Sequence, residues 1–419
     1  MRGAPASASR RRPPRSPREW ALRGGLAVAA LVAGGFSTAQ TFGYALRGVA
    51  PERAVAFAPG DGRILADLAE QRAASGATDA RTRARIDALA RQALRREPMA
   101  APALTALAID AEYRGDRTAA RRFIAQSDRL SRRELGTRLW LIEDAVGRGD
   151  IKAALGHYDV ALRTARAAPD TLFPVLAQAI GDEQINRGAA AILAKSPAWK
   201  DEFFAYLGEK SSDPAASARL FRRLTAAGVA PGEGPQAGVV NALIAKGRFA
   251  SAWDFYRTLR PGARRDRLRD PEFTAGLARP SLFDWLPVTL DAGISASIQG
   301  GERGGVFDFA APATVGGTVL QQFELLAPGT YRLSGRSAGL AQPADSRPYW
   351  QLVCADGREA GRVEVGNADQ GEGRFAGTLT VPAGCPAQTL RLVVRPSNEL
   401  GGVTGQIEQV SLAPVGRPE

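Results

Sequence analysis

The sequence predicts a multidomain protein, α first and then β: a single transmembrane helix, an α-solenoid and a C-terminal antiparallel β-sandwich. Three observations predict this class. Residues 24–46 contain no charged side chain, and a glycine-centred motif recurs after 34 positions. Near Pro280, Ala-, Leu- and Arg-rich runs give way to Gly, Thr, Val and alternation of apolar with polar residues. A chain of 419 residues is long enough for two or more cores.

The N-terminal region predicts a membrane anchor. Residues 1–23 form a basic tail with seven Arg and one Glu, which we expect to stay in the cytoplasm. At about 1.5 Å per residue, residues 24–46 are long enough to span a membrane as a signal anchor. A cleaved signal peptide, with Ser37-Thr38-Ala39 as its cleavage site, is the alternative. Either way we expect the bulk of the chain in the periplasm; an uncleaved anchor makes it a single-pass inner-membrane protein.

The net charge of +12 does not predict a nucleic-acid partner. About half of the excess lies in the N-terminal tail, and the rest is spread over nearly 400 residues. No Arg cluster with interleaved aromatic residues occurs, as a nucleic-acid groove would require. We therefore expect no nucleic acid among the partners.

After a linker at residues 47–58, residues 59–280 are predicted to form a helical repeat domain. The motif that starts at Arg114-Gly115-Asp116 recurs at Arg148-Gly149-Asp150, and a third copy starts at Lys246-Gly247. The glycine is expected to end one helix in a left-handed turn, and small Ala residues then allow close helix pairing. The period is not kept through residues 170–235, so the number of repeats there stays open.

This region resembles tetratricopeptide repeats, whose period is 34 residues. The residues that carry the resemblance are Leu107, Ala108, Gly115, Ala120 and Ile124 in the first unit, and Leu141, Ile142, Gly149, Ala154, Tyr158 and Ala161 in the second. The resemblance implies a concave surface that binds a protein partner.

Residues 281–416 are predicted to form the β-sandwich, because short alternating segments follow one another between turns. The predicted strands are 295–299, 305–310, 319–326, 330–337, 349–355, 375–381, 389–395 and 404–412.

Two segments of this region resemble jelly-roll carbohydrate-binding modules. They are Leu326-Ala327-Pro328-Gly329-Thr330-Tyr331-Arg332-Leu333 and Gln406-Ile407-Glu408-Gln409-Val410-Ser411-Leu412. The resemblance implies a jelly roll that binds glycans. Glu408-Gln409 replaces the acidic pair of the family, so we expect no structural metal and no cofactor. The Phe283-Asp284-Trp285 opening of this region, which follows a helical end, is similar to that of exported alphaproteobacterial repeat proteins, some of which belong to exopolysaccharide systems.

The candidate ligand-binding residues are aromatic and planar polar side chains of the β domain: Tyr349, Gln351, Arg332, Trp285 and Arg391. In the segment YWQLVC, alternation assigns Trp350, Leu352 and Cys354 to the core and Tyr349, Gln351 and Val353 to the opposite face. An ordinary polar sheet face is the alternative interpretation. Cys354 and Cys385, the only cysteines, are expected to form a disulfide, with two buried thiols as the alternative.

Catalysis is not expected. The single histidine, His157, lies on a predicted packed helix, and Asp308 lies on a strand between two phenylalanines, where alternation turns it outward. No nucleophile, phosphate-loop or metal-ligand motif is present. The sequence therefore predicts a membrane-anchored scaffold that binds a partner through its helices and a glycan through its sandwich. A glycan-processing enzyme and a sandwich that only caps the solenoid are the alternatives.

Overall fold

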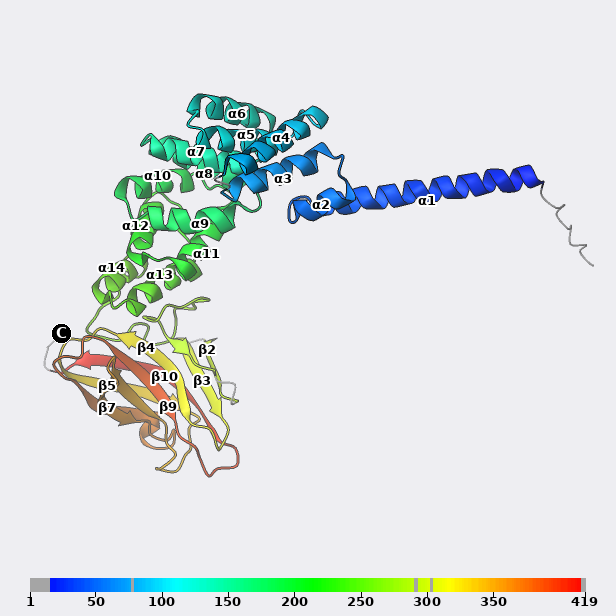
Figure 1. The fold of residues 1–419 in the computed structure, drawn as a ribbon. Coiled ribbons are helices and arrows are strands. Elements are labelled where there is room, and N and C mark those ends of the chain that lie inside the picture. Colours follow the sequence, from blue (N-terminus) through cyan, green and yellow to red (C-terminus); the bar gives the residue numbers. More distant parts are fainter. Residues whose placement is uncertain (1–15, 77–78, 290–292, 302–303, 416–419) are drawn as a thin grey trace, which may run out of the picture. The chain divides into compact units, whose positions relative to one another are not determined.

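The computed structural model in Figure 1 describes residues 16–76, 79–289, 293–301 and 304–415. The chain divides into two compact units, Met1–Ala165 and Arg166–Glu419. The first unit contains α1–α8, and the second contains α9–α14 followed by β1–β10. The predicted fold class is confirmed, since α-helices end at Leu259 and two antiparallel sheets follow.

The first unit begins with a long apolar helix. Its helices are α1 (Pro17–Leu46), α2 (Pro51–Phe57), α3 (Gly62–Ala74), α4 (Ala80–Arg96), α5 (Ala101–Tyr113), α6 (Arg117–Leu130), α7 (Leu135–Gly147) and α8 (Ile151–Thr164). Helix α1 starts inside the predicted basic tail, with Ser16 as its N-cap. Within the described residues, α1 is the only helix long and apolar enough to cross a membrane, a property that a signal sequence shares.

The C-terminal end of α1 packs against the rest of the first unit. Gly43 is buried, and a Cβ at this position would lie 3.1 Å from Ala58 Cβ and 3.2 Å from Ile64 Cδ1. Ala54, Ala58 and Ile64 form a small hydrophobic cluster around it. The predicted linker 47–58 thus contains α2 and is part of a packed structure, because its alanines allow this close approach.

Helices α5–α6 and α7–α8 reproduce the predicted 34-residue period. Each bound of α7 and α8 lies 34 positions after the matching bound of α5 and α6. Gly115 and Gly149 join the helices of each pair at φ of 77° and 72°, a conformation that costs glycine little. Asp116 and Asp150 then cap the second helices by accepting backbone N–H groups at 2.9 Å.

The helical part of the second unit packs through aromatic side chains. Its helices are α9 (Ala168–Ala179), α10 (Glu183–Leu193), α11 (Lys200–Lys210), α12 (Pro214–Ala226), α13 (Glu233–Ala245) and α14 (Phe249–Leu259). The ring centroids of Phe204 and Phe221 are 5.6 Å apart, and those of Phe221 and Phe255 are 6.3 Å apart. Large aromatic rings thus fill the space between these helices, in the part of the chain where the 34-residue period is not kept.

The remaining chain forms two five-stranded antiparallel sheets (Figure 1). Sheet A has the order β1-β4-β9-β6-β7, and sheet B has the order β2-β3-β10-β5-β8. The strands are β1 (Leu286–Pro287), β2 (Ser295–Gly301), β3 (Gly304–Ala311), β4 (Gly317–Glu324), β5 (Gly329–Ala338), β6 (Tyr349–Cys354), β7 (Glu359–Glu364), β8 (Arg374–Val381), β9 (Gln388–Val394) and β10 (Val403–Pro414); a short 3₁₀ helix, η1 (Gly371–Gly373), precedes β8.

The inner faces of the two sheets form one hydrophobic core, which includes the fully buried Trp350 and Phe307. The predicted pair Cys354 and Cys385 is bonded as a disulfide, with its Cα atoms 5.6 Å apart. The bond connects the end of β6 to the segment before β9, on the core side of sheet A.

Strands β1 and β7 were not predicted. β1 has only two residues, too few for alternation to be visible. In β7, a register shift against β6 coincides with Gly361 at φ 132°, and this bulge breaks the period of two. β4 ends at Glu324, two residues before the predicted end of that strand.

Arg269 connects the segment after α14 to sheet A. Its guanidinium donates to both carboxylate oxygens of Glu324, at 2.7 and 2.9 Å, and to the carbonyl of Phe283, at 2.7 Å. Arg269 is 7% exposed and Glu324 is 0% exposed. The ring of Phe283 lies 5.4 Å from that of Trp253 on α14 and 5.8 Å from that of Phe323 on β4. The last helix and the sandwich therefore share a buried joint within the second unit.

Candidate functional site

Four planar polar side chains form a row across the outer face of sheet A. Gln321 of β4 pairs with Arg391 of β9, Arg391 pairs with Gln351 of β6, and Gln351 pairs with Arg362 of β7. Their neighbours along the strands are buried in the core: Leu320, Gln322, Trp350, Leu352, Leu390, Leu392 and Val363. Alternation therefore turns all four planar groups away from the core. We call this surface the polar row.

Tyr349 lies beside the polar row, opposite Glu364 of β7. The guanidinium carbons of Arg362 and Arg395 lie 4.0 and 4.7 Å from its ring centroid, within cation–π distance. Arg395 also forms an ion pair with Glu364 at 3.1 Å. The ring is thus held by two cations, and a ligand that stacked on it would have to share its π surface with them.

Glu359 connects two members of the polar row, Gln351 of β6 and Arg362 of β7, through hydrogen bonds. It accepts hydrogen bonds from Gln351 Nε2 and, at 3.1 Å, from Arg362. The hydrogen bond from Gln351, followed by that from Arg362, lowers the pKa of Glu359. The hydrogen bond to Glu359 in turn raises the pKa of Arg362, so this pair is charged at neutral pH.

Arg391 differs from the other cations of this face. Its Nε is buried and has no hydrogen-bond partner. Within the described part of the chain, no other guanidinium nitrogen of Arg391 forms a hydrogen bond or ion pair. Arg362 and Arg395 are each paired with a glutamate. The centre of the polar row therefore carries one positive charge that the protein itself does not balance.

Trp285, predicted as a ligand-binding residue, lies at the hydrophobic core and not on the polar row. Trp285 is 4% exposed, and its ring lies 5.8 Å from that of the core residue Trp350. Its indole N–H donates to the carbonyl of Asp270 at 2.9 Å. Trp285 also lines a hollow of about 510 Å³, together with Phe273 and Leu277. Its role in ligand binding therefore stays a prediction, at a place other than the polar row.

Arg332, also predicted as a ligand-binding residue, lies apart from the polar row. Arg332 lies on β5 of sheet B, whereas Tyr349, Gln351 and Arg391 lie on sheet A. Its side chain is exposed, and its strand neighbours Tyr331 and Leu333 are buried. Arg332 therefore points outward from the opposite side of the sandwich.

Sequence reasoning missed Gln321, Glu359, Arg362, Glu364 and Arg395 as members of this surface. Arg362 and the two glutamates lie in or next to β7, whose bulge hides the alternation. For Gln321 and Arg395 the signal was present, since both lie in predicted strands at outward positions. What the sequence lacked was the order of the strands, which brings these positions together.

The residues set aside as catalytic candidates do not form a catalytic arrangement in the described residues. Burial, with a contribution from Arg138 and Arg148, lowers the pKa of His157, so its imidazole is neutral near pH 7. Asp308 points outward from β3, as alternation predicted, and accepts a hydrogen bond from Gln406 at 3.1 Å. Within the described part of the chain, no group of three or more His, Cys, Asp or Glu side chains is placed to hold a metal ion.

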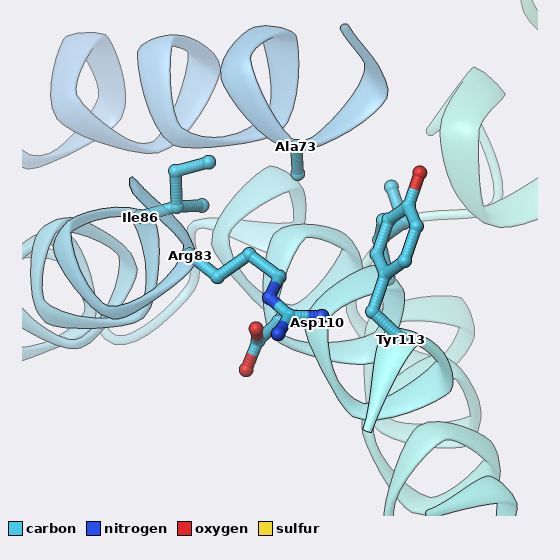
Figure 2. A pocket seen from close by; sticks show the side chains of 6 residues that line it. Ala73, Arg83, Ile86, Asp110 and Tyr113 are labelled. Atoms are coloured by element: carbon cyan, nitrogen blue, oxygen red, sulfur yellow. The ribbon is translucent and has the colours of Figure 1, made fainter. Parts of the chain in front are cut away.

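Two hollows, one small and one large, lie on described helices of the first unit. Figure 2 shows the smaller one, where the guanidinium of Arg83 lies beside the carboxylate of Asp110 and 5.9 Å from the ring centroid of Tyr113. At about 10 Å³ it has room for about one water molecule. The larger hollow has a volume of about 480 Å³, and Trp140 and Arg121 are among the residues that line it.

Comparison with family models gives no match, and comparison with curated proteins gives none either. Among solved structures, a carbohydrate-binding module described as "CBM4 structure and function" is 20% identical, with a TM-score of 0.26; the match covers 35% of this chain and 99% of that one. TmCBM61, solved with β-1,4-galactotriose, is 16% identical, with coverage of 36% and 99% and a TM-score of 0.26. The CBM22-1 xylan-binding domain of Paenibacillus barcinonensis Xyn10C is 13% identical, with coverage of 36% and 97% and a TM-score of 0.25. The likeness concerns the C-terminal part of the chain.

Proposed function

We propose that the chain is a membrane-anchored periplasmic scaffold whose β-sandwich binds a polysaccharide along the polar row, in envelope or exopolysaccharide biosynthesis or export. The observation that carries the proposal is the row itself. Neighbouring strands lie about 4.8 Å apart, so side chains on four adjacent strands extend over roughly 14 Å. A row of this length contacts more than one sugar ring of an extended chain.

The chemistry of the row fits a glycan. Gln321 and Gln351 have amide groups that both donate and accept hydrogen bonds, as sugar hydroxyl groups do. Arg391 and Arg362 add donors in fixed planes. The outward face of a sheet holds these groups on rigid backbone, which lowers the entropy lost on binding.

Binding of polysaccharides to the full chain in detergent tests this proposal. A panel of neutral and acidic polymers is immobilised, and the chain is compared with Gln351→Ala and Gln321→Ala. We expect at least one polymer to bind and each substitution to weaken binding about tenfold, the effect of losing one or two hydrogen bonds. Arg332→Ala, on the other sheet, is the matched control. No binding to any polymer would contradict the proposal.

The proposed scaffold has a second contact surface in the 480 Å³ hollow of the first unit. Trp140 offers an apolar contact there, while Arg121 and Asp144 form an ion pair at 3.0 Å on its wall. This mixture of aromatic and charged groups suits a protein segment. Photo-crosslinking from position Val146, which is 61% exposed, would capture that partner in membranes; Leu400, exposed on the sandwich, is the control position.

A structural role of the sandwich is the second candidate, favoured by the joint around Arg269 and Glu324. In that case the sandwich covers the end of α14 and binds nothing. We assign no catalytic activity in either case. Incubation with a bound polymer, followed by measurement of new reducing ends, checks this: release that depends on a carboxylate pair would identify an enzyme instead.

A further inference from the structure

We propose that the ligand of the polar row is an acidic polysaccharide, and that a carboxylate of the polymer binds Arg391. This inference rests on the proposed function, because it names the class of glycan that the same surface takes. It follows from the charge of Arg391, which the described residues leave without a partner.

A count of charges on this face leads to the inference. Arg362 pairs with Glu359 at 3.1 Å, and Arg395 pairs with Glu364 at 3.1 Å. Both pairs are complete within the protein. Arg391 stands between Gln321 and Gln351, which are neutral, so its positive charge has no counterpart in the polar row.

The geometry of Arg391 favours a planar anion. A guanidinium offers five N–H donors in a fixed fork and binds a carboxylate through two parallel hydrogen bonds. Its buried Nε lacks an acceptor in the protein, and a buried donor without a partner is costly. A carboxylate that approached along the outer face would accept from the two Nη groups of the fork and neutralise the charge.

The neighbouring glutamates limit the charge density of the ligand. Glu359 and Glu364 lie on β7, at the next strand but one from Arg391. A polymer with several closely spaced negative groups would place some of them near these carboxylates and be repelled. One carboxylate per sugar, as in a polyuronate, fits one unbalanced arginine better than a densely sulfated chain does.

The test measures binding of the full chain in detergent to three probes: alginate, carboxyl-reduced alginate and dextran sulfate. We expect alginate to bind at least tenfold more tightly than its carboxyl-reduced form, since a charged hydrogen-bonded contact is lost. Dextran sulfate should bind more weakly than alginate. Arg391→Gln should weaken alginate binding at least tenfold, while Arg332→Gln, which removes the same charge from the other sheet, should leave it within twofold.

The outcomes separate this inference from the proposed function. Equal binding of alginate and its reduced form, or equal behaviour of the Arg391→Gln and Arg332→Gln variants, would overturn the acidic ligand while leaving glycan binding in place. Stronger binding of dextran sulfate would overturn the choice of a carboxylate. No binding to any neutral or acidic polymer would overturn both. Arg391→Lys keeps the charge and loses the fork, so it should bind with intermediate affinity; the comparison of polymers needs no variant.

Discussion

Arg269, which contacts sheet A, and Arg391, which lies on it, have opposite relations to the protein around them. Arg269, in the joint between α14 and the sandwich, is 7% exposed and donates hydrogen bonds to a carboxylate and to backbone carbonyls. Arg391, at the centre of the polar row, has a buried Nε with no acceptor, and its other nitrogens have no partner in the described residues. The protein itself pairs the charge of Arg269, whereas the described residues leave the charge of Arg391 unpaired.

This difference separates a structural charge from a binding charge. Removing one partner of a buried ion pair leaves the other charge without compensation, so Arg269 should matter for stability. Removing a charge that has no partner costs the fold little, so Arg391 should matter for binding alone. Substitutions at Arg269 and at Arg391 test this contrast directly.

The largest effect is expected from Arg269→Met. This change leaves the buried carboxylate of Glu324 without its ion-pair partner. It should lower the free energy of unfolding of the second unit by about 3–5 kcal/mol. Denaturant unfolding measures it. The double variant Arg269→Met, Glu324→Leu should recover most of the loss, because it removes both charges. A single variant as stable as the native chain would contradict the structural role of Arg269.

The pH dependence of that loss has a defined sign. Burial raises the pKa of Glu324 to about 7, although Arg269 acts to lower it. A raised pKa means stability that is present below the ordinary value of 4.5 and lost as pH rises through about 7. Without Arg269, the effect of burial on the pKa of Glu324 is no longer opposed. Arg269→Met should therefore lower the free energy of unfolding more at pH 8 than at pH 5.

The next largest effect is expected from the double change Cys354→Ala, Cys385→Ala. The disulfide closes a loop with a sequence separation of 31, and its loss should cost about 3–4 kcal/mol through the entropy of the unfolded chain. Thermal unfolding with and without a reducing agent measures this. Because the bond lies on the core side of sheet A, glycan binding should survive wherever the variant is folded. Loss of binding in the folded variant would show that the polar row depends on the bond.

A smaller effect concerns three carboxyl groups of the first unit. Burial raises the pKa of Asp67 to about 6, that of Glu70 well above its ordinary value and that of Glu134 as well. Stability from these groups is present below their ordinary pKa values and is lost as pH rises through the raised ones.

Because of these three groups, the first unit should be less stable at pH 8 than at pH 5. Glu70→Gln should flatten this dependence, whereas Glu209→Gln, on an exposed helical site of the second unit, should not. Unfolding at both pH values measures the slopes. Identical slopes in both variants would show that the cluster does not titrate as described.

The smallest change in stability is expected from Arg391→Gln. Since the guanidinium has no partner to lose, the melting temperature should stay the same or rise, by the equivalent of at most about 1 kcal/mol. Calorimetry on this variant and on Arg332→Gln gives the comparison. A loss as large as that of Arg269→Met would show that Arg391 is structural.

The sequence predicted the parts of this picture that depend on local periodicity. Alternation in YWQLVC assigned Trp350 to the core and Gln351 to the outer face, and the 34-residue motif placed the turns at Gly115 and Gly149. Alternation follows from the geometry of a single strand, and the repeat follows from the geometry of a single helix pair. Both can therefore be recognised without knowledge of contacts between distant elements.

The members of the polar row and the buried ion pair of Arg269 depend on contacts between distant elements, which alternation does not reveal. Alternation distinguishes inward from outward positions but not sheet A from sheet B, so Arg332 and Arg391 looked equivalent. Trp285 lies next to a two-residue strand, where no period exists to reveal burial. The bond between Arg269 and Glu324 joins residues 55 positions apart, and only the folded chain brings them together.

Binding of alginate and carboxyl-reduced alginate by the native chain, the Arg391→Gln variant and the Arg332→Gln variant tests the central claim most directly. The polar row predicts tight binding of alginate by the native chain and by the Arg332→Gln variant, and at least tenfold weaker binding when either Arg391 or the carboxylate of the polymer is removed. Equal affinities for both polymers in all three proteins would contradict it.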